Sequence, residues 1–339
     1  MATAAKSKTN VPIVFGAMTF GRAGVEQARV HDINDASKMV DIFLEYGHNE
    51  IDTARVYGMG SSEEYLGQFQ PSYTERGIVM DTKLYPGTMT GIKITHTSDD
   101  LRKHLDLSLQ ALKVDKVDMF YLHGPDRSTP YEETFAMCDV LHKEGKFDRL
   151  GLSNYMAWEV AYIQEICIKN GWIRPSVYQG VYNAIHRSVE SELFPCLRHY
   201  NMGFYAFNPI AGGYLTSRYH RETVEQEVEA TSRFDKKTMQ GQAYRKRYFN
   251  DTMFDALDII REAAGKHGLR ESECALRWMT HHSMLKEERG DKIIIGASTE
   301  KHLRENLEDL EKGPLPEDVV QALDKAWETT KGVVSNYFH

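Results

Sequence analysis

The sequence predicts an α/β fold, a (β/α)8 barrel of the TIM type with a long loop after the seventh strand and an extra helix at its C-terminal end. Short apolar runs alternate with longer segments of helical periodicity along the chain of 339 residues. Such alternation is typical of parallel strands that are covered by helices. A doubly wound open sheet fits the alternation as well, but the count of eight strands and their near-even spacing favour the closed barrel.

The predicted strands are short runs with almost entirely apolar cores. They are expected at residues 11–18, 50–52, 78–82, 117–122, 147–152, 177–179, 202–207 and 292–295. Because these cores are almost continuously apolar, we expect the strands to be buried on both faces.

Helices are predicted between the strands from apolar spacing and from their start and stop signals. The first helix ends at Gly47, and another begins where Thr129, Pro130 and Glu132 combine an N-cap, a first-turn proline and a capping-box glutamate. The predicted helices lie at residues 35–46, 62–68, 98–112, 129–145, 156–169, 189–199, 252–266, 271–284, 299–311 and 316–329.

One segment, residues 211–251, breaks this rhythm because it is polar, rich in Arg and Tyr, and has no clear strand. Loops of this length are usually functional, so we expect it to cover a cofactor and substrate site. The chain is expected to form one barrel domain at 11–339, which includes a C-terminal tail at 330–339. Residues 1–10 are expected to be a disordered leader.

Composition excludes several classes of protein. The 41 Lys and Arg residues against 49 Asp and Glu residues give a net charge of −8, which argues against a nucleic-acid partner. No apolar run is long enough to span a membrane, and the N-terminus lacks the apolar stretch of a secretory signal. The four cysteines form no C-x-x-C pair and no zinc-type spacing occurs, so we expect a cytoplasmic protein without a metal.

Polar residues stand where several apolar strands end. Asp52 ends the second strand and Tyr57 lies in the loop after it, while Lys83 and His123 follow the third and fourth strands. In a (β/α)8 barrel these positions meet at one face, where active sites lie. Taken singly, Asp52 fits a helix cap and His123 fits a structural histidine, but these readings explain the combination poorly.

The chemistry of this group suits carbonyl reduction. A phenol such as that of Tyr57 has a pKa of about 10, and a neighbouring ammonium such as that of Lys83 lowers it. An aspartate keeps that lysine charged and oriented. A nearby histidine orients a carbonyl oxygen or relays its proton. The group can therefore give a proton to oxygen while a hydride reaches carbon.

A nucleotide site needs other residues, because neither a G-x-G-x-x-G fingerprint nor a Walker A loop is present. Gly212 and Gly213 after the seventh strand allow close approach of a pyrophosphate. Arg218 and Arg233 in the long loop are candidates to bind it through charge-assisted hydrogen bonds, although both also fit solvated loop residues. The helix that begins near 299, after G-A-S at 296–298, offers an anion site at its N-terminus.

Together these strand-end motifs resemble the aldo-keto reductases over essentially the whole chain from Val11. The matching segments are E-I-D-T-A-R-V-Y at 50–57, D-T-K at 81–83, Y-L-H at 121–123, G-L-S-N at 151–154, Y-Q at 178–179 and A-F-N-P-I-A-G-G at 206–213. The chain is most similar to the branch of aflatoxin-aldehyde reductases, also described as succinic semialdehyde reductases. That likeness is carried by F-Y-L-H-G-P-D at 120–126, E-L-F-P-C-L-R at 192–198 and N-Y-F at 336–338.

The resemblance implies a role for each strand-end residue. Tyr57 is the proton donor, Lys83 lowers its pKa, and Asp52 pairs with Lys83. His123 orients the substrate carbonyl.

The resemblance also implies a nicotinamide site, with Phe207 stacked on the ring. The carboxamide of that ring would be held by Ser153, Asn154 and Gln179. The other residues expected at the cofactor are Asn208, Gly212, Gly213, Arg218, Arg233, Gly296, Ser298, His302 and Asn306.

The expected cofactor is NADPH, which family members usually prefer. One departure bears on this expectation. Many members have P-K-S after the eighth strand, whose lysine neutralises the 2′-phosphate, whereas this chain has I-G-A-S at 295–298. Ser298, Thr299 and His302 are expected to take over that role.

The substrate is expected to be a small carbonyl compound, an aldehyde or some ketones or dicarbonyls. Within A-Y-R-K-R-Y at 243–248, Arg247 is our first candidate and Arg245 our second for a substrate carboxylate, with Tyr244 and Phe338 as further substrate contacts. The same run also fits a solvated helix face.

Other functions stay open from the sequence. Potassium-channel β subunits share this fold and these four residues, yet act largely as nucleotide-binding modules and redox sensors. A pathway-specific reductase of secondary metabolism has the same sequence features as a detoxifying enzyme. Relatives in this branch often form homodimers, so a homodimer stays open for this chain.

Overall fold

The computed structural model describes residues 7–89, 92–223 and 232–339. Within these residues, eight parallel strands close into a barrel in the order β1-β10-β9-β8-β7-β6-β3-β2. The strands are β1 Ile13–Gly16, β2 Glu50–Asp52, β3 Val79–Leu84, β6 Val117–Leu122, β7 Phe147–Ser153, β8 Pro175–Val181, β9 Gly203–Phe207 and β10 Lys292–Ile295. The predicted (β/α)8 barrel is therefore confirmed.

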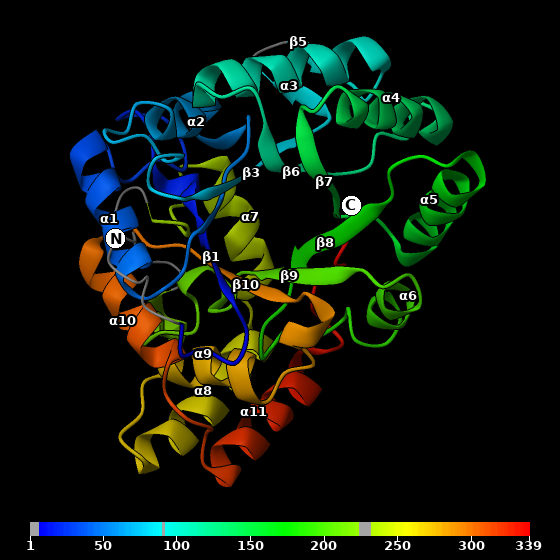
Figure 1. Ribbon diagram of the computed structural model, residues 1–339. Helices are drawn as coiled ribbons and strands as arrows, with labels where there is room; N and C mark the ends of the chain where they lie inside the picture. The colour runs from blue at the N-terminus through cyan, green and yellow to red at the C-terminus, as the bar shows by residue number, and fades with distance from the viewer. Residues whose placement is uncertain (1–6, 90–91, 224–231) are drawn as a thin grey trace.

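Helices surround the barrel on its outer face (Figure 1). They are α1 Ile33–Glu45, α2 Ser61–Leu66, α3 Ser98–Leu112, α4 Tyr131–Lys143, α5 Ala157–Asn170, α6 Leu193–His199, α8 Asp251–Lys266, α9 Glu271–His281, α10 Glu300–Leu310 and α11 Glu317–Thr330. Each lies within a few residues of its prediction. In the described part of the chain, no helix is both long enough and apolar enough to cross a bilayer.

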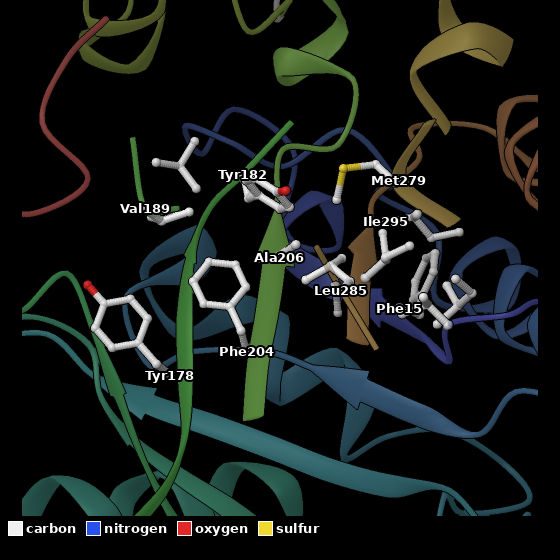
Figure 2. Packing of buried hydrophobic residues seen from close by; sticks show 14 of the residues in the cluster. Phe15, Tyr178, Tyr182, Val189, Phe204, Ala206, Met279, Leu285 and Ile295 are labelled. Atoms are coloured by element: carbon white, nitrogen blue, oxygen red, sulfur yellow. The ribbon is translucent and has the colours of Figure 1, made fainter. Parts of the chain in front are cut away.

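Strand alternation divides the apolar residues between two cores. On β1, Val14 points into the barrel with a small interior cluster, while Ile13 and Phe15 join the large cluster between barrel and helices. Figure 2 shows part of this outer layer, where the rings of Tyr178 and Phe204 stack with centroids 5.9 Å apart. This packing fixes the strand ends that carry the polar residues.

The long segment after β9 contains a helix that is absent from the predicted set, although a helix face was one of the two interpretations of the run at 243–248. Helix α7 spans Met239–Tyr248, and the Thr238 hydroxyl caps it by accepting a hydrogen bond from the Gly241 amide at 2.9 Å. Tyr244 on this helix donates to Asn208 Oδ1 at 3.0 Å, just after β9. This part of the segment thus packs onto the strand ends, while residues 224–231 of the predicted loop lie outside the described residues.

A second unpredicted feature follows β3. Strands β4 (Gly87–Met89) and β5 (Ile92–Ile94) form a two-stranded antiparallel sheet beside the barrel. The predicted leader lies partly outside the described residues, which begin at residue 7.

Candidate active site

Three of the strand-end residues form one buried hydrogen-bonded group. Lys83 on β3 donates from Nζ to Asp52 Oδ2 at 2.7 Å and to the Tyr57 hydroxyl at 3.2 Å. A further hydrogen bond to the Thr53 carbonyl at 2.7 Å fixes the same ammonium. Lys83 is completely buried, so its position is set by these oxygens rather than by water.

Burial and the neighbouring charges shift the pKa values of Lys83 and Tyr57 in opposite directions. Burial disfavours the ammonium, but the Asp52 carboxylate and the Tyr57 oxygen outweigh it and raise the pKa of Lys83. Burial raises the pKa of the Tyr57 phenol, while Lys83 acts to lower it through charge and hydrogen bonding. The phenol therefore stays protonated at neutral pH, and the adjacent ammonium is placed to stabilise the phenolate left by proton transfer.

His123, immediately after β6, meets Tyr57 edge to face with ring centroids 5.8 Å apart. Burial and the charge of Lys83 lower its pKa well below the usual value. The imidazole is therefore neutral at physiological pH. Its Nδ1 has no hydrogen-bond partner among the described residues.

Amide side chains connect the neighbouring strand ends to this group. Gln179 on β8 donates from Nε2 to Asp52 Oδ1 at 2.8 Å. Asn154, with a positive φ of 64°, donates from Nδ2 to the His123 carbonyl at 2.8 Å and to Ser153 Oγ at 3.0 Å. These bonds hold the ends of β2, β6, β7 and β8 in fixed relation.

The group opens into a cavity of about 980 Å³ at the mouth of the barrel. Asp52, Tyr57 and His123 line it, together with most of the other predicted residues. These are Asn154, Gln179, Phe207, Asn208, Gly212, Gly213, Arg218, Arg233, Tyr244, Arg247, Gly296, Ser298, His302 and Asn306. Lys83, Ser153, Arg245 and Phe338 are not among its lining residues.

Part of the cavity lining has the features of an anion site. Arg233 donates to Asn208 Oδ1 at 3.2 Å and lies near Gly296, where a Cβ would come within 3.5 Å of its Nη2. Beside them, the Thr299 hydroxyl caps α10 by accepting from the His302 amide at 3.1 Å. A helix N-terminus next to guanidinium groups favours bound phosphates.

The two candidate arginines of α7 face different ways. Arg247 lines the cavity and makes no ion pair with any described residue. Arg245 instead donates from Nε to the Phe234 carbonyl at 2.5 Å and covers the Phe249 ring at 5.0 Å. The structure therefore distinguishes the two arginines: Arg247 faces the cavity and Arg245 does not.

Several lining residues were not predicted. Tyr85 lies two positions after Lys83, and its ring is edge-on to His123 with centroids 5.5 Å apart. This strand-end position was a signal that could have identified it. His339 also lines the cavity, through a tail whose amide donates to the Asn154 carbonyl at 3.3 Å. No sequence pattern indicates that contact.

The (β/α)8 barrel brings together at its mouth a tyrosine, a lysine, an aspartate and a histidine, the groups that reduction of a carbonyl compound requires. The chain matches the Aldo/keto reductase family model over residues 12–328 and belongs to that family. It is 46% identical over 338 residues to aldo-keto reductase pigE of Monascus ruber, covering 98% of each chain. It is 43% identical to human aldo-keto reductase family 7 member A3, again over 98% of both chains.

A third relative is mouse aflatoxin B1 aldehyde reductase member 2, with 43% identity over 93% of this chain and 86% of the relative. The predicted resemblance to this branch is confirmed. Family membership gives carbonyl reduction as the general activity of this protein.

Proposed function

We propose that the protein is an NADPH-dependent aldehyde reductase that also reduces some ketones or dicarbonyls, with Tyr57 as the proton donor. The observation that carries this proposal is the buried Lys83 ammonium, which contacts both Asp52 and Tyr57 beside the neutral His123. The printed name of the mouse relative, an aldehyde reductase, supports the substrate class.

The cavity suits a nicotinamide dinucleotide. Its volume of about 980 Å³ and the arginines in its lining fit a large anionic ligand. Gly213, with a φ of 98°, has open space on its Cβ side, and the buried Asn208 Nδ2 lacks a partner among the described residues. When bound here, NADPH would supply the hydride.

The four polar residues would then control the proton and the substrate oxygen. Neutral His123 orients the carbonyl oxygen next to the Tyr57 hydroxyl. Tyr57 gives its proton to that oxygen, and the Lys83 ammonium stabilises the phenolate. Asp52 holds Lys83 charged, with Gln179 binding its other oxygen.

Preference for NADPH over NADH rests on positive charge around Arg233 and the start of α10. Arg233 and the N-terminus of α10 lie together there, and Arg218 lines the same cavity. Ser298 and His302 add polar groups, with Ser298 Oγ 3.4 Å from His302 Nδ1. We therefore assign the 2′-phosphate to these residues.

We assign a contact with the substrate carboxylate to Arg247. Its guanidinium lines the cavity without an ion-pair partner in the described chain, and it lies close enough to lower the pKa of His339.

The cysteines are free thiols, and three of them are buried, which supports the cytoplasm as the compartment.

The test is steady-state reduction of an aldehyde panel with NADPH and with NADH. We expect turnover of aromatic and carboxylated aldehydes, with higher kcat/KM for NADPH. Tight nucleotide binding without turnover of any aldehyde would contradict the proposal and favour a nucleotide-binding module like the potassium-channel β subunits.

A further inference from the structure

A second, smaller pocket lies directly beside the catalytic cavity. Its volume is about 170 Å³, and it is lined by Arg55, Val56, Leu84, Tyr85, Gly87, Thr88 and Ile94. Part of the lining comes from the two strand ends that carry the proton donor and its lysine, because Val56 precedes Tyr57 and Leu84 follows Lys83. Strand β5 adds Ile94 to the lining.

Tyr85 and Val56 line both spaces, so they form the wall between the pocket and the cavity. The ring of Tyr85 is flanked by two glycines. A Cβ at Gly124 would lie 3.3 Å from Cε2 of this ring, and a Cβ at Gly87 would lie 3.4 Å from Cε1. Since Gly124 has no positive φ that demands glycine, its missing side chain is explained by the close approach of the Tyr85 ring.

The pocket is chemically suited to one apolar ring. Val56, Leu84 and Ile94 supply aliphatic walls. Among the described lining residues the charged one is Arg55, whose Nη1 donates to Glu63 Oε2 at 2.5 Å, so its charge is already compensated. A dry cavity of about 150 Å³ is enough to hold benzene. The pocket therefore matches a phenyl group in size and polarity.

We propose that this pocket is a latent subsite for one apolar ring of a carbonyl substrate: the Tyr85 ring closes it off from the catalytic cavity in the wild-type enzyme and so limits the size of substrate that the enzyme accepts. The inference rests on the proposed function, because it places the reacting carbonyl at Tyr57 and His123. Removing the Tyr85 ring would join the two spaces beside the proton donor.

The experiment measures kcat/KM for benzaldehyde, 3-phenylbenzaldehyde and 4-phenylbenzaldehyde. The readout is a selectivity ratio: kcat/KM for the better of the two phenyl-substituted substrates divided by kcat/KM for benzaldehyde. Tyr85→Ala opens the wall and Tyr85→Phe keeps the ring. The double variant Tyr85→Ala with Thr88→Phe also opens the wall, but places a phenyl side chain from β4 in the pocket. Tyr162→Ala is the matched control, because Tyr162 is 43% exposed against 39% for Tyr85 and lies on α5.

Burial of one aryl ring predicts that Tyr85→Ala raises the ratio about tenfold or more. Tyr85→Phe and Tyr162→Ala should keep the wild-type ratio, and the added Thr88→Phe should return it to the wild-type value. An unchanged ratio in Tyr85→Ala, or a gain that survives Thr88→Phe, overturns the proposal.

A binding measurement separates this result from the proposed function. Calorimetry with 3-phenyl- and 4-phenylbenzyl alcohol should show at least one of them binding about tenfold tighter to Tyr85→Ala than to wild type, and the filled variant should lose that gain. If the wild-type enzyme reduces no aldehyde, the proposed function fails. The binding data alone then show whether the pocket accepts an aryl ring once the Tyr85 ring is removed. Equal affinities for all variants reject the subsite even if benzaldehyde is reduced normally.

Discussion

Replacing Arg247 by alanine should reduce activity only toward substrates that carry a carboxylate. The guanidinium lines the cavity from α7 and forms no ion pair with the described residues. It is also held close to the Tyr244 ring, 5.8 Å from its centroid. A carboxylate would therefore gain a new charged hydrogen bond without displacing an existing carboxylate from Arg247.

The magnitude follows from the loss of that contact. A hydrogen bond to a charged group is worth about 1.5–3 kcal/mol. This corresponds to a fall of about 10–150-fold in kcat/KM when the contact is removed. Because Arg247 is only half-buried, a value in the lower part of that range is expected.

The assay uses two substrates of nearly equal shape, 4-carboxybenzaldehyde and 4-nitrobenzaldehyde. Arg247→Ala should lower kcat/KM for the first and change it little for the second. Arg245→Ala is the matched control, since that side chain binds the Phe234 carbonyl and does not line the cavity. An equal fall for both substrates would show that α7 positions the cofactor or closes the site, and the carboxylate assignment would be wrong.

Four further outcomes are expected. Lys83→Met removes the charge that lowers the pKa of Tyr57, so kcat should fall at least as far as for loss of the general acid, about 10²–10⁴-fold, with nucleotide affinity unchanged in a fluorescence titration. Arg233→Ala should weaken NADPH more than NADH in the same titration, and equal losses would reject a role in 2′-phosphate binding. Because the pKa of His123 is lowered and that of Tyr57 is raised, kcat for reduction should be flat from pH 6 to 8, and a titration near pH 6.5 would contradict a neutral His123. Burial raises the pKa of the Asp81 carboxyl well above normal. Ionisation of Asp81 therefore opposes folding as the pH rises above about 4. In urea melts, Asp81→Asn should add roughly 1–3 kcal/mol to the free energy of unfolding at pH 8, and this gain should shrink toward pH 4.

Much of the fold could be predicted because the strands and helices differ in hydrophobic period. The apolar run at 117–122 and the polar His123 after it predict both a buried strand and a side chain at the barrel mouth. The same reasoning identified Asp52, Tyr57 and Lys83, which the structure brings into hydrogen-bonding distance.

What could not be predicted depends on contacts between distant segments. Helix α7 has almost no apolar face of its own, and the run that contains Arg245 and Arg247 did not reveal which side chain turns inward. The approach of His339 to the cavity depends on a tail that meets Asn154 across the barrel mouth. The wall formed by Tyr85 requires the neighbouring glycines, whose proximity only the folded chain reveals.

The central claim is that Tyr57 gives the proton to the substrate oxygen from its place beside Lys83. Tyr57→Phe keeps the ring and its edge-to-face contact with His123 but removes the hydroxyl. The direct measurement is kcat for NADPH-dependent reduction of 4-nitrobenzaldehyde, with nucleotide Kd measured on the same protein. We predict a fall in kcat of about 10²–10⁴-fold with Kd unchanged. Turnover close to that of the wild type would contradict the account.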